Sequence, residues 1–160
     1  MVALGTSGCA GYKLGPVNGA SAGAKAVQIN PFTNTTLEPR LGDEVTAQLR
    51  RQLQRDATFK LASHDDGDIV VSGSVIRYQR LAISLTPSDT LTVLDYRLEL
   101  RAQVTARERS TGKMILNQPV MGYTIIRVAG DLTSTERQAL PLLAADFAKN
   151  VIALLAEGGW

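Results

Sequence analysis

The sequence predicts an α+β fold in which two helices pack on one face of a mostly antiparallel sheet of four to five strands, in the order β-α-β-β-β-β-α. Two observations carry this prediction. Residues 94–108 alternate apolar with polar or charged side chains, the pattern of a strand with one buried and one solvated face. Residues 37–57 and the last part of the chain instead repeat their apolar residues at helical spacing.

The size and composition of the chain fit one globular domain. It has 160 residues, of which 44% are hydrophobic and 20% charged. A formal net charge of +2 is modest and by itself indicates no nucleic-acid partner. We divide the chain into residues 1–24, a residual signal sequence with a lipidation motif and a flexible tether, and residues 25–160, a single α+β domain.

The only cysteine, Cys9, follows Gly5-Thr6-Ser7-Gly8 near the N-terminus. Small residues before a cysteine suit a lipoprotein signal peptidase, after whose cut the cysteine is acylated. Thr6 stands where Leu or Val is usual, and only eight residues precede Cys9, so a free thiol in a flexible tail is the alternative. No run of about 18 apolar residues is present, so we expect any membrane attachment to use a lipid anchor. Glycine, serine and asparagine make residues 10–24 a tether.

The first half of the domain predicts a strand, a helix and a second strand. Residues 24–30 alternate, and residues 31–36 turn the chain. A helix over 37–57 follows, with Pro39 in its first turn, where a missing N–H costs nothing. Its apolar residues recur every four positions: Leu37, Leu41, Val45, Leu49 and Leu53. Residues 59–62 form a short strand.

Three long strands are expected over 69–85, 94–108 and 114–128. In the first, one face carries Ile69, Val71, Gly73 and Val75 and continues through Leu81, Ile83 and Leu85. Pro119 has no backbone N–H to donate to a neighbouring strand, so the third strand should lie at an edge of the sheet or contain a bulge at this residue.

The last element is a helix. Thr133 and Glu136 have the spacing of a capping box, in which each side chain bonds the other residue's free N–H. Pro141 should kink the first turns or mark a later start. Gly158 and Gly159 end the helix.

Catalytic and metal-binding patterns are missing from the sequence. His64 is the only histidine, and it lies in an Asp-Asp-Gly turn, so no paired-histidine metal site or rigid Ser-His-Asp set is available. Asp65, Asp66 and Asp68 lack the spacing and final glutamate of a calcium loop. We predict neither an enzyme nor a metal site.

Arginines are the remaining candidates for function. Arg97, Arg101 and Arg107 share the solvated face of one strand, and Arg77 and Arg80 lie on the strand before it. Their planar guanidinium groups match phosphate and carboxylate oxygens, although each arginine alone could serve only solubility. Nucleic acid is disfavoured because exposed aromatic residues are nearly absent from this face.

Several motifs resemble the LptE family of lipopolysaccharide-assembly lipoproteins. Cys9-Ala10-Gly11-Tyr12-Lys13-Leu14 is similar to the family's Cys-Gly-Tyr-x-Leu opening, with Ala10 where glycine is usual. Residues 27–36 (VQINPFTNTT) resemble its first strand and F-x-N-x-T turn. The similarity continues through residues 37–41, 49–53 and 68–75, and the element order agrees from Cys9 to the final helix.

The resemblance implies an outer-membrane lipoprotein on the periplasmic side that plugs an LptD-type β-barrel, assists its assembly and binds lipopolysaccharide. It implies a covalent lipid on Cys9, with no other cofactor. Residue 10 is alanine, so no aspartate after Cys9 indicates inner-membrane retention. The residues we expect to face lipopolysaccharide or the barrel are Arg77, Arg80, Arg97 and Arg101.

Residues 27–75 also resemble other periplasmic lipoproteins, such as activators of penicillin-binding proteins and curli-secretion subunits. The alternative function is therefore an accessory lipoprotein that binds and activates a cell-wall synthase or belongs to a secretion complex. The short tether favours the LptE reading, because a synthase activator has to reach across the periplasm.

Overall fold

The structure is a computed structural model and describes residues 24–158. Cys9, the tether up to residue 23, and Gly159 lie outside the described residues. The elements in chain order are β1 (Ala26–Ile29), β2 (Thr33–Asn34), α1 (Leu41–Arg55), β3 (Lys60–Leu61), β4 (Ile69–Thr86), β5 (Asp89–Glu108), β6 (Met114–Arg127) and α2 (Leu132–Glu157).

The sheet is mixed, and its long pairings are antiparallel. It has six strands in the order β3-β1-β4-β5-β6, with β2 beside β4. The three long strands form two antiparallel pairs, as predicted, whereas β1 pairs parallel with β3 and β4, and β2 pairs parallel with β4. The connection through α1 returns the chain to the same end of the sheet, and this makes β1 and β3 parallel.

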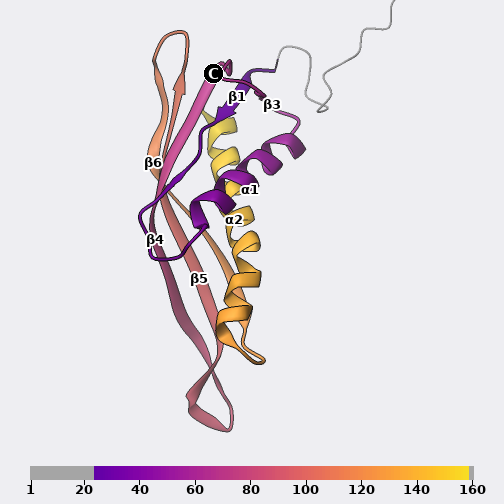
Figure 1. Cartoon of the computed structure of the whole chain (residues 1–160), viewed down its shortest axis with the longest axis vertical. Coiled ribbons are helices and arrows are strands. Elements are labelled where there is room, and N and C mark those ends of the chain that lie inside the picture. The colour runs from indigo at the N-terminus through magenta and orange to yellow at the C-terminus, as the bar shows by residue number, and fades with distance from the viewer. Residues whose placement is uncertain (1–23, 159–160) are drawn as a thin grey trace, which may run out of the picture.

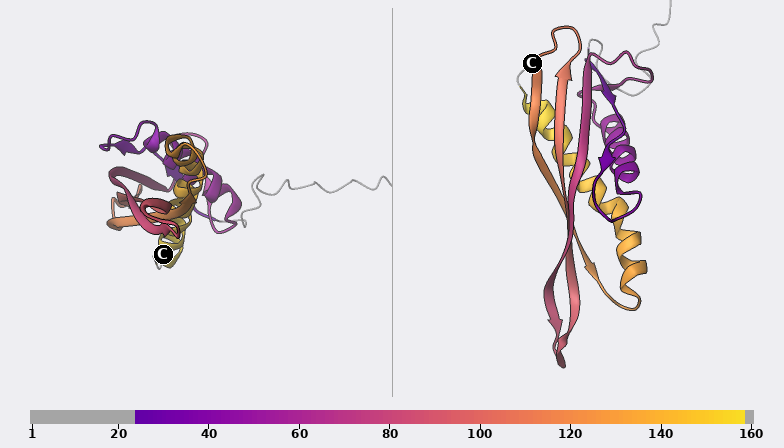
Figure 2. Two further views of the ribbon diagram at one scale, coloured as in Figure 1. Left: turned by 90° about the horizontal axis from the view of Figure 1, so that it is seen from below. Right: turned by 60° about the vertical axis from the view of Figure 1, so that its left-hand side comes forward.

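The molecule is elongated, and the hairpin of β4 and β5 projects beyond the helices (Figure 1). Both ends of the described chain lie at the opposite end of the molecule from the hairpin tip (Figures 1 and 2). Both helices lie on one side of the sheet: α2 packs on β6 and β5, and α1 packs on α2. The prediction of two helices on one sheet face is therefore confirmed.

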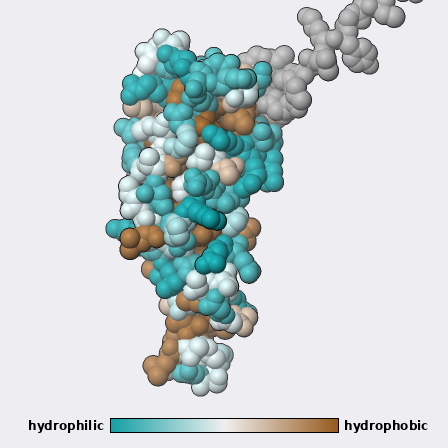
Figure 3. Space-filling view, in the orientation of Figure 1, coloured by the Kyte–Doolittle hydropathy of each residue, from teal (hydrophilic) through white to brown (hydrophobic). Residues whose placement is uncertain are grey.

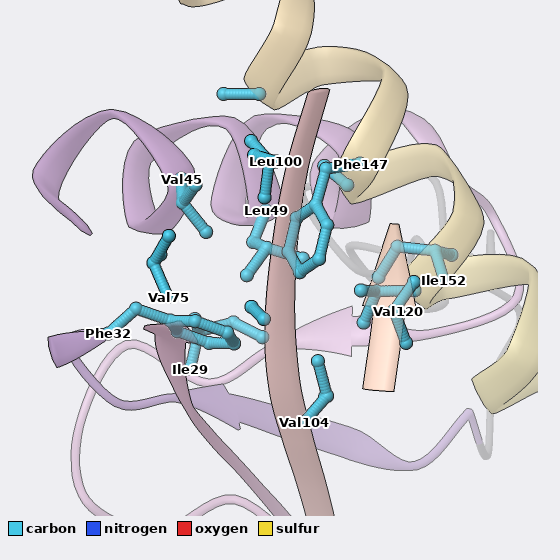
Figure 4. Packing of buried hydrophobic residues seen from close by; sticks show 14 of the residues in the cluster. Ile29, Phe32, Val45, Leu49, Val75, Leu100, Val104, Val120, Phe147 and Ile152 are labelled. Atoms are coloured by element: carbon cyan, nitrogen blue, oxygen red, sulfur yellow. The ribbon is translucent and has the colours of Figure 1, made fainter. Parts of the chain in front are cut away.

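The core lies between the helices and the predicted dry face of β5. The side chains of this face are fully buried as expected: Leu98, Leu100, Ala102, Val104 and Ala106. Phe147 of α2 is also fully buried, and its ring meets Phe32 edge to face, with centroids 6.2 Å apart and planes at 80°. Figure 4 shows Phe147 among Leu49, Leu100 and Val120, so one aromatic ring joins both helices to the sheet.

The prediction that one face of β4 runs from Ile69 to Leu85 is wrong in its second half. A bulge lies between Val75 and Arg77 and another between Ala82 and Ser84. The first bulge adds Ile76, and this extra residue moves the side chains that follow it, including Leu81, to the other face of the sheet. Beyond the first bulge the core side carries Tyr78, whereas Leu81, Ile83 and Leu85 are exposed by 40%, 45% and 48%.

Helix α1 begins at Leu41, not at residue 37. Leu37 is fully exposed, and Pro39 precedes the helix instead of occupying its first turn. The chain enters through Arg40 in the left-handed region (φ 64°) without a side-chain cap. The Asn34 side chain holds the preceding turn, since its Nδ2 donates to the Glu38 carbonyl at 2.7 Å and its Oδ1 accepts from Thr36 N–H at 3.0 Å.

Helix α2 begins earlier than the predicted capping box. Asp131 is the N-cap, and its carboxylate accepts the Ser134 N–H at 2.8 Å. Thr133 lies inside the first turn, so the Thr133–Glu136 box is wrong. The helix continues through Pro141 to Glu157, and Gly158 is its C-cap. By length and composition α2 could cross a membrane, contrary to the expectation from the sequence, but one side of it is packed in the core of this domain.

The edge of the sheet at β6 is covered by α2. As expected, Pro119 lies on an edge strand. Beside it, Asp146 of α2 accepts the Tyr123 N–H at 3.0 Å, and Asn150 of α2 donates to the Met121 carbonyl at 2.9 Å. Gly122 lets the helix come this close, because a Cβ atom there would lie 2.6 Å from the backbone nitrogen of Phe147.

Candidate anion-binding face of the sheet

Three of the four arginines predicted as site residues lie on the sheet face turned away from the helices. Arg97 and Arg101 alternate with buried residues along β5, and Arg77 of β4 is the register partner of Arg101. On β6, the register partners on the same face are Met121 and Ile125. We call this surface the arginine face and define it by Arg77, Gln79, Arg97, Glu99, Arg101, Met121, Tyr123 and Ile125.

Arg77 and Arg101 form an uncompensated positive pair. Like charges directly opposite each other on neighbouring strands are destabilising. No hydrogen bond or ion pair with another described residue engages the Arg77 guanidinium, and Arg101 donates only to the sulfur of Met121, at 3.2 Å. A cavity of about 60 Å³ lies between them, with lining residues Gln79, Glu99, Leu100 and Met121 in addition to the two arginines. An anionic group placed between the two guanidinium groups would relieve their repulsion.

The single carboxylate at the centre of the arginine face is already engaged. Glu99 accepts a hydrogen bond of 2.7 Å from Gln79 and lies 3.8 Å from Arg97. Arg97 also stacks over the ring of Tyr123, 5.2 Å from its centroid. Three arginines therefore face one carboxylate, and the surplus of positive charge lies at Arg77 and Arg101.

Arg80, the fourth predicted site residue, lies on the other side of the sheet. It is the register partner of Leu98, which is buried in the core. Its guanidinium packs over Tyr96 at 5.5 Å and donates to Glu136 of α2 at 2.7 Å. Arg80 thus ties the β4–β5 hairpin to the start of α2 and does not lie with the other three.

The apolar residues of this face were not predicted from the sequence. Met121, Tyr123 and Ile125 of β6 are exposed by 42%, 54% and 55%, and Leu81 of β4 faces Arg97. Tyr123 is the one aromatic residue among those that define this face. The arginines are consequently flanked on both sides by apolar side chains, an arrangement that matches a ligand with both anionic and apolar parts.

The projecting hairpin adds further exposed apolar surface. Figure 3 shows hydrophobic residues gathered at the end of the molecule beyond the helices. Leu91 near the hairpin tip is exposed by 91%, and Leu85 across the hairpin by 48%. No helix covers this part of the hairpin, so these side chains have nothing to pack against within the described part of the chain.

His64 lies in the predicted turn and is exposed. One of its ring nitrogens is 3.1 Å from the hydroxyl of Ser63. Within residues 24–158, no three His, Cys, Asp or Glu side chains are grouped so that they could hold a metal ion.

A second cluster of polar groups lies on the helix side of the hairpin. The Tyr78 hydroxyl donates to one carboxylate oxygen of Glu136, and Arg80 donates to the other. Burial is the main cause that raises the pKa of the Tyr78 phenol, and the hydrogen bond to Glu136 raises it further. Burial and the nearby Glu136 also raise the pKa of Glu38 above its usual range. The cluster therefore favours a protonated Tyr78.

This pKa predicts an alkaline loss of stability. An unfolded tyrosine releases its proton near pH 10, whereas native Tyr78 retains it, so the free energy of unfolding should fall as the pH rises above about 10. In Tyr78→Phe this contribution should vanish, because phenylalanine has no proton to release. Urea unfolding of both proteins at pH 9 and pH 11 measures the difference. An identical loss in the two proteins would contradict the assignment.

These observations define an α+β domain with two helices on one side of a mixed sheet and an open arginine face on the other. The family model of LptE, described as lipopolysaccharide-assembly, matches residues 24–155, so the chain belongs to the LptE family. This family consists of non-enzymatic envelope lipoproteins that act in lipopolysaccharide assembly. No curated protein matches the chain in sequence.

Solved structures share the fold at low sequence identity. Protein CT253 from Chlamydia trachomatis is 13% identical with a TM-score of 0.58, and the match covers 85% of this chain and 96% of that one. Protein XCC0632 from Xanthomonas campestris is 8% identical with a TM-score of 0.59, covering 84% and 85%. A minor lipoprotein from Acinetobacter baumannii is 13% identical with a TM-score of 0.53, covering 85% and 96%. At these identities the likeness shows the fold alone.

Proposed function

We propose that this protein is an outer-membrane lipoprotein, lipidated at Cys9, that plugs an LptD-type β-barrel, assists its assembly and binds lipopolysaccharide during delivery to the cell surface. Membership in the LptE family supports the general role in lipopolysaccharide assembly. The observation that carries the binding function is the arginine face, where the Arg77–Arg101 pair lacks a carboxylate and apolar side chains lie on both sides.

The chemistry of lipopolysaccharide fits this face. Its lipid part carries phosphate groups beside acyl chains, and a phosphate between Arg77 and Arg101 would accept hydrogen bonds from both guanidinium groups. Met121 and Ile125 would then contact the adjoining hydrocarbon. Each of these side chains is exposed before binding, so the apolar contact removes surface from water and adds to the affinity.

The test is reversal of the positive pair. In Arg77→Glu/Arg101→Glu we expect binding of labelled lipopolysaccharide in a pull-down to fall at least about tenfold, because two attractive charges become repulsive. The control Arg51→Glu/Arg55→Glu makes the same change of net charge on the exposed side of α1. Circular dichroism checks that both variants fold. Equal binding by the wild type and both variants would exclude the arginine face as the lipid site.

The partner is tested with the same full-length proteins. Affinity purification from outer membranes should recover an LptD-type barrel in stoichiometric amount with the wild type. A penicillin-binding protein or a secretion ring in its place would contradict the proposed partner. Loss of lipopolysaccharide binding with the barrel retained would separate the lipid function of the arginine face from docking.

A further inference from the structure

The outer edge of β4 is open over its second half. On this side, β1 pairs with β4 at Ile69–Val71, and β2 pairs with it at Ser74 and Val75. The last backbone hydrogen bond from this side is donated by Thr35 to the Val75 carbonyl, at 3.0 Å. From Ile76 to Thr86, no described strand lies beside this edge.

The register identifies the backbone groups that point away from the sheet. The Leu94 carbonyl of β5 accepts a hydrogen bond from the N–H of Val128, the residue that directly follows β6. Backbone groups of successive strand residues point to opposite sides, so the even-numbered residues of β5 direct theirs toward β6. Tyr96, Leu98 and Leu100 are even-numbered, and their partners on β4 are Ala82, Arg80 and Tyr78. These three β4 residues therefore direct N–H and C=O groups outward, into space that a further strand could occupy.

The opposite edge of the sheet is closed from Pro119 to Tyr123, across β5 from Ser74 to Gln79 of β4. On β6 the outward positions are Pro119, Met121 and Tyr123. Proline has no N–H, the Met121 carbonyl accepts from Asn150, and the Tyr123 N–H donates to Asp146. Helix α2 thus hinders strand addition along this part of β6, whereas no described element covers the edge of β4 beyond Ile76.

A groove runs along the open edge. It has a volume of about 530 Å³, and its walls are the turn at residues 35–38, the first half of the open edge, and Glu136 of α2. Its charged residues are Arg77, which no described carboxylate pairs, Arg80, which Glu136 pairs, and Glu38 of the turn. The raised pKa of Glu38 lowers the negative charge of this wall. The edge also exposes apolar side chains, including Ile76 and Leu81.

The charges decide which kind of strand fits. A second copy of this chain would bring its own Arg77 and Arg80 to the same seam, and facing arginines repel. A segment of another protein with an acidic side chain beside Arg77 would pair the free guanidinium, and apolar residues next to the acidic one would lie on the opposite face of the sheet, beside Tyr78.

We propose that the edge of β4 from Ile76 to Leu85 takes up an extended, acidic segment of another protein as an added strand. Main-chain hydrogen bonds to Tyr78, Arg80 and Ala82 hold the segment, and its carboxylate pairs with Arg77. The site shares Arg77 with the arginine face, whereas the added strand lies in the plane of the sheet and leaves Arg101 and the face of β6 uncovered.

The probe is a capped nine-residue peptide of alternating glutamate and valine, added to the isotope-labelled full chain without lipid. We expect the amide protons of Tyr78, Arg80 and Ala82 to exchange more slowly with solvent on binding, and that of Ile125 on the β6 edge to stay unchanged. A peptide with lysine in place of glutamate should bind at least about tenfold more weakly.

Two variants test the mechanism. Ala82→Pro removes one outward N–H and should weaken peptide binding, whereas Ala82→Ser keeps this N–H and should not. If Ala82→Pro disturbs the hairpin, Arg77→Glu keeps the backbone and should prefer the lysine peptide. Equal affinity for both peptides, protection at β6, or dimerisation of the protein through the β4 edge would each overturn the proposal. None of these readouts involves lipopolysaccharide or a barrel, so they are independent of the proposed function.

Discussion

Phe147→Ala should lower the free energy of unfolding by about 3–5 kcal/mol, the usual cost of removing a buried aromatic ring. Phe147 is fully buried and meets the ring of Phe32 edge to face. Its loss leaves a cavity where α2 meets the sheet, next to Leu49 of α1 (Figure 4). The surrounding strands and helices are held by their own hydrogen bonds, and this limits how far they can collapse into the space.

Urea unfolding followed by circular dichroism measures this effect. The control is Leu142→Ala on the same helix, since Leu142 is 64% exposed and its truncation should change the stability by less than about 0.5 kcal/mol. Similar losses in the two variants would show that α2 is not held through Phe147.

Gly122→Ala is expected to cost about 1–3 kcal/mol, the range for overpacking a filled interior. A Cβ atom at Gly122 would lie 2.6 Å from the Cβ and backbone nitrogen of Phe147 and 2.7 Å from its Cα. Helix backbone cannot rotate out of the way as a side chain can, so α2 has to move away from β6. That movement would also lengthen the bonds that Asp146 and Asn150 make to the edge of β6.

The matched control for this substitution is Gly130→Ala. Gly130 precedes α2, and an added Cβ atom there would meet nothing within 4 Å. We expect its urea midpoint to equal that of the wild type or rise slightly, because alanine restricts the unfolded chain. A loss at Gly130 as large as at Gly122 would contradict the steric explanation.

The buried face of β5 could be predicted because alternation is a local signal. Leu98 to Ala106 are apolar at every second position, and no other register buries them. The bulges of β4 could not be predicted. Leu81, Ile83 and Leu85 continue the same alternation whichever face they occupy, and only the pairing with β5 shows that the phase has changed.

The predicted start of α2 was wrong for a different reason. Asp131 and Thr133 are both residues that cap helices, and the sequence offers a plausible glutamate for only one of them. In the structure, Glu136 instead binds Tyr78 and Arg80, which lie far away in the sequence. A tertiary contact of this kind leaves no local pattern.

The candidate site was predicted in part. Arg97 and Arg101 are four residues apart, an even spacing that places both on one side of a strand. Arg77 and Arg80 are three apart, and this odd spacing alone could have separated Arg80 from the group. Met121, Tyr123 and Ile125 were missed because β6 is apolar on both faces.

Both ends of the described chain lie far from the tip of the β4–β5 hairpin. The start of β1 and the end of α2 lie at one end, and the turn between β4 and β5 lies at the other (Figure 1). Fully extended, the 20 residues of β5 would span about 68 Å. A domain held by its first residues could therefore touch, with Leu91 and its apolar neighbours, a surface tens of ångströms from its point of attachment. Shortening the hairpin would reduce this reach while leaving the helix-covered core in place.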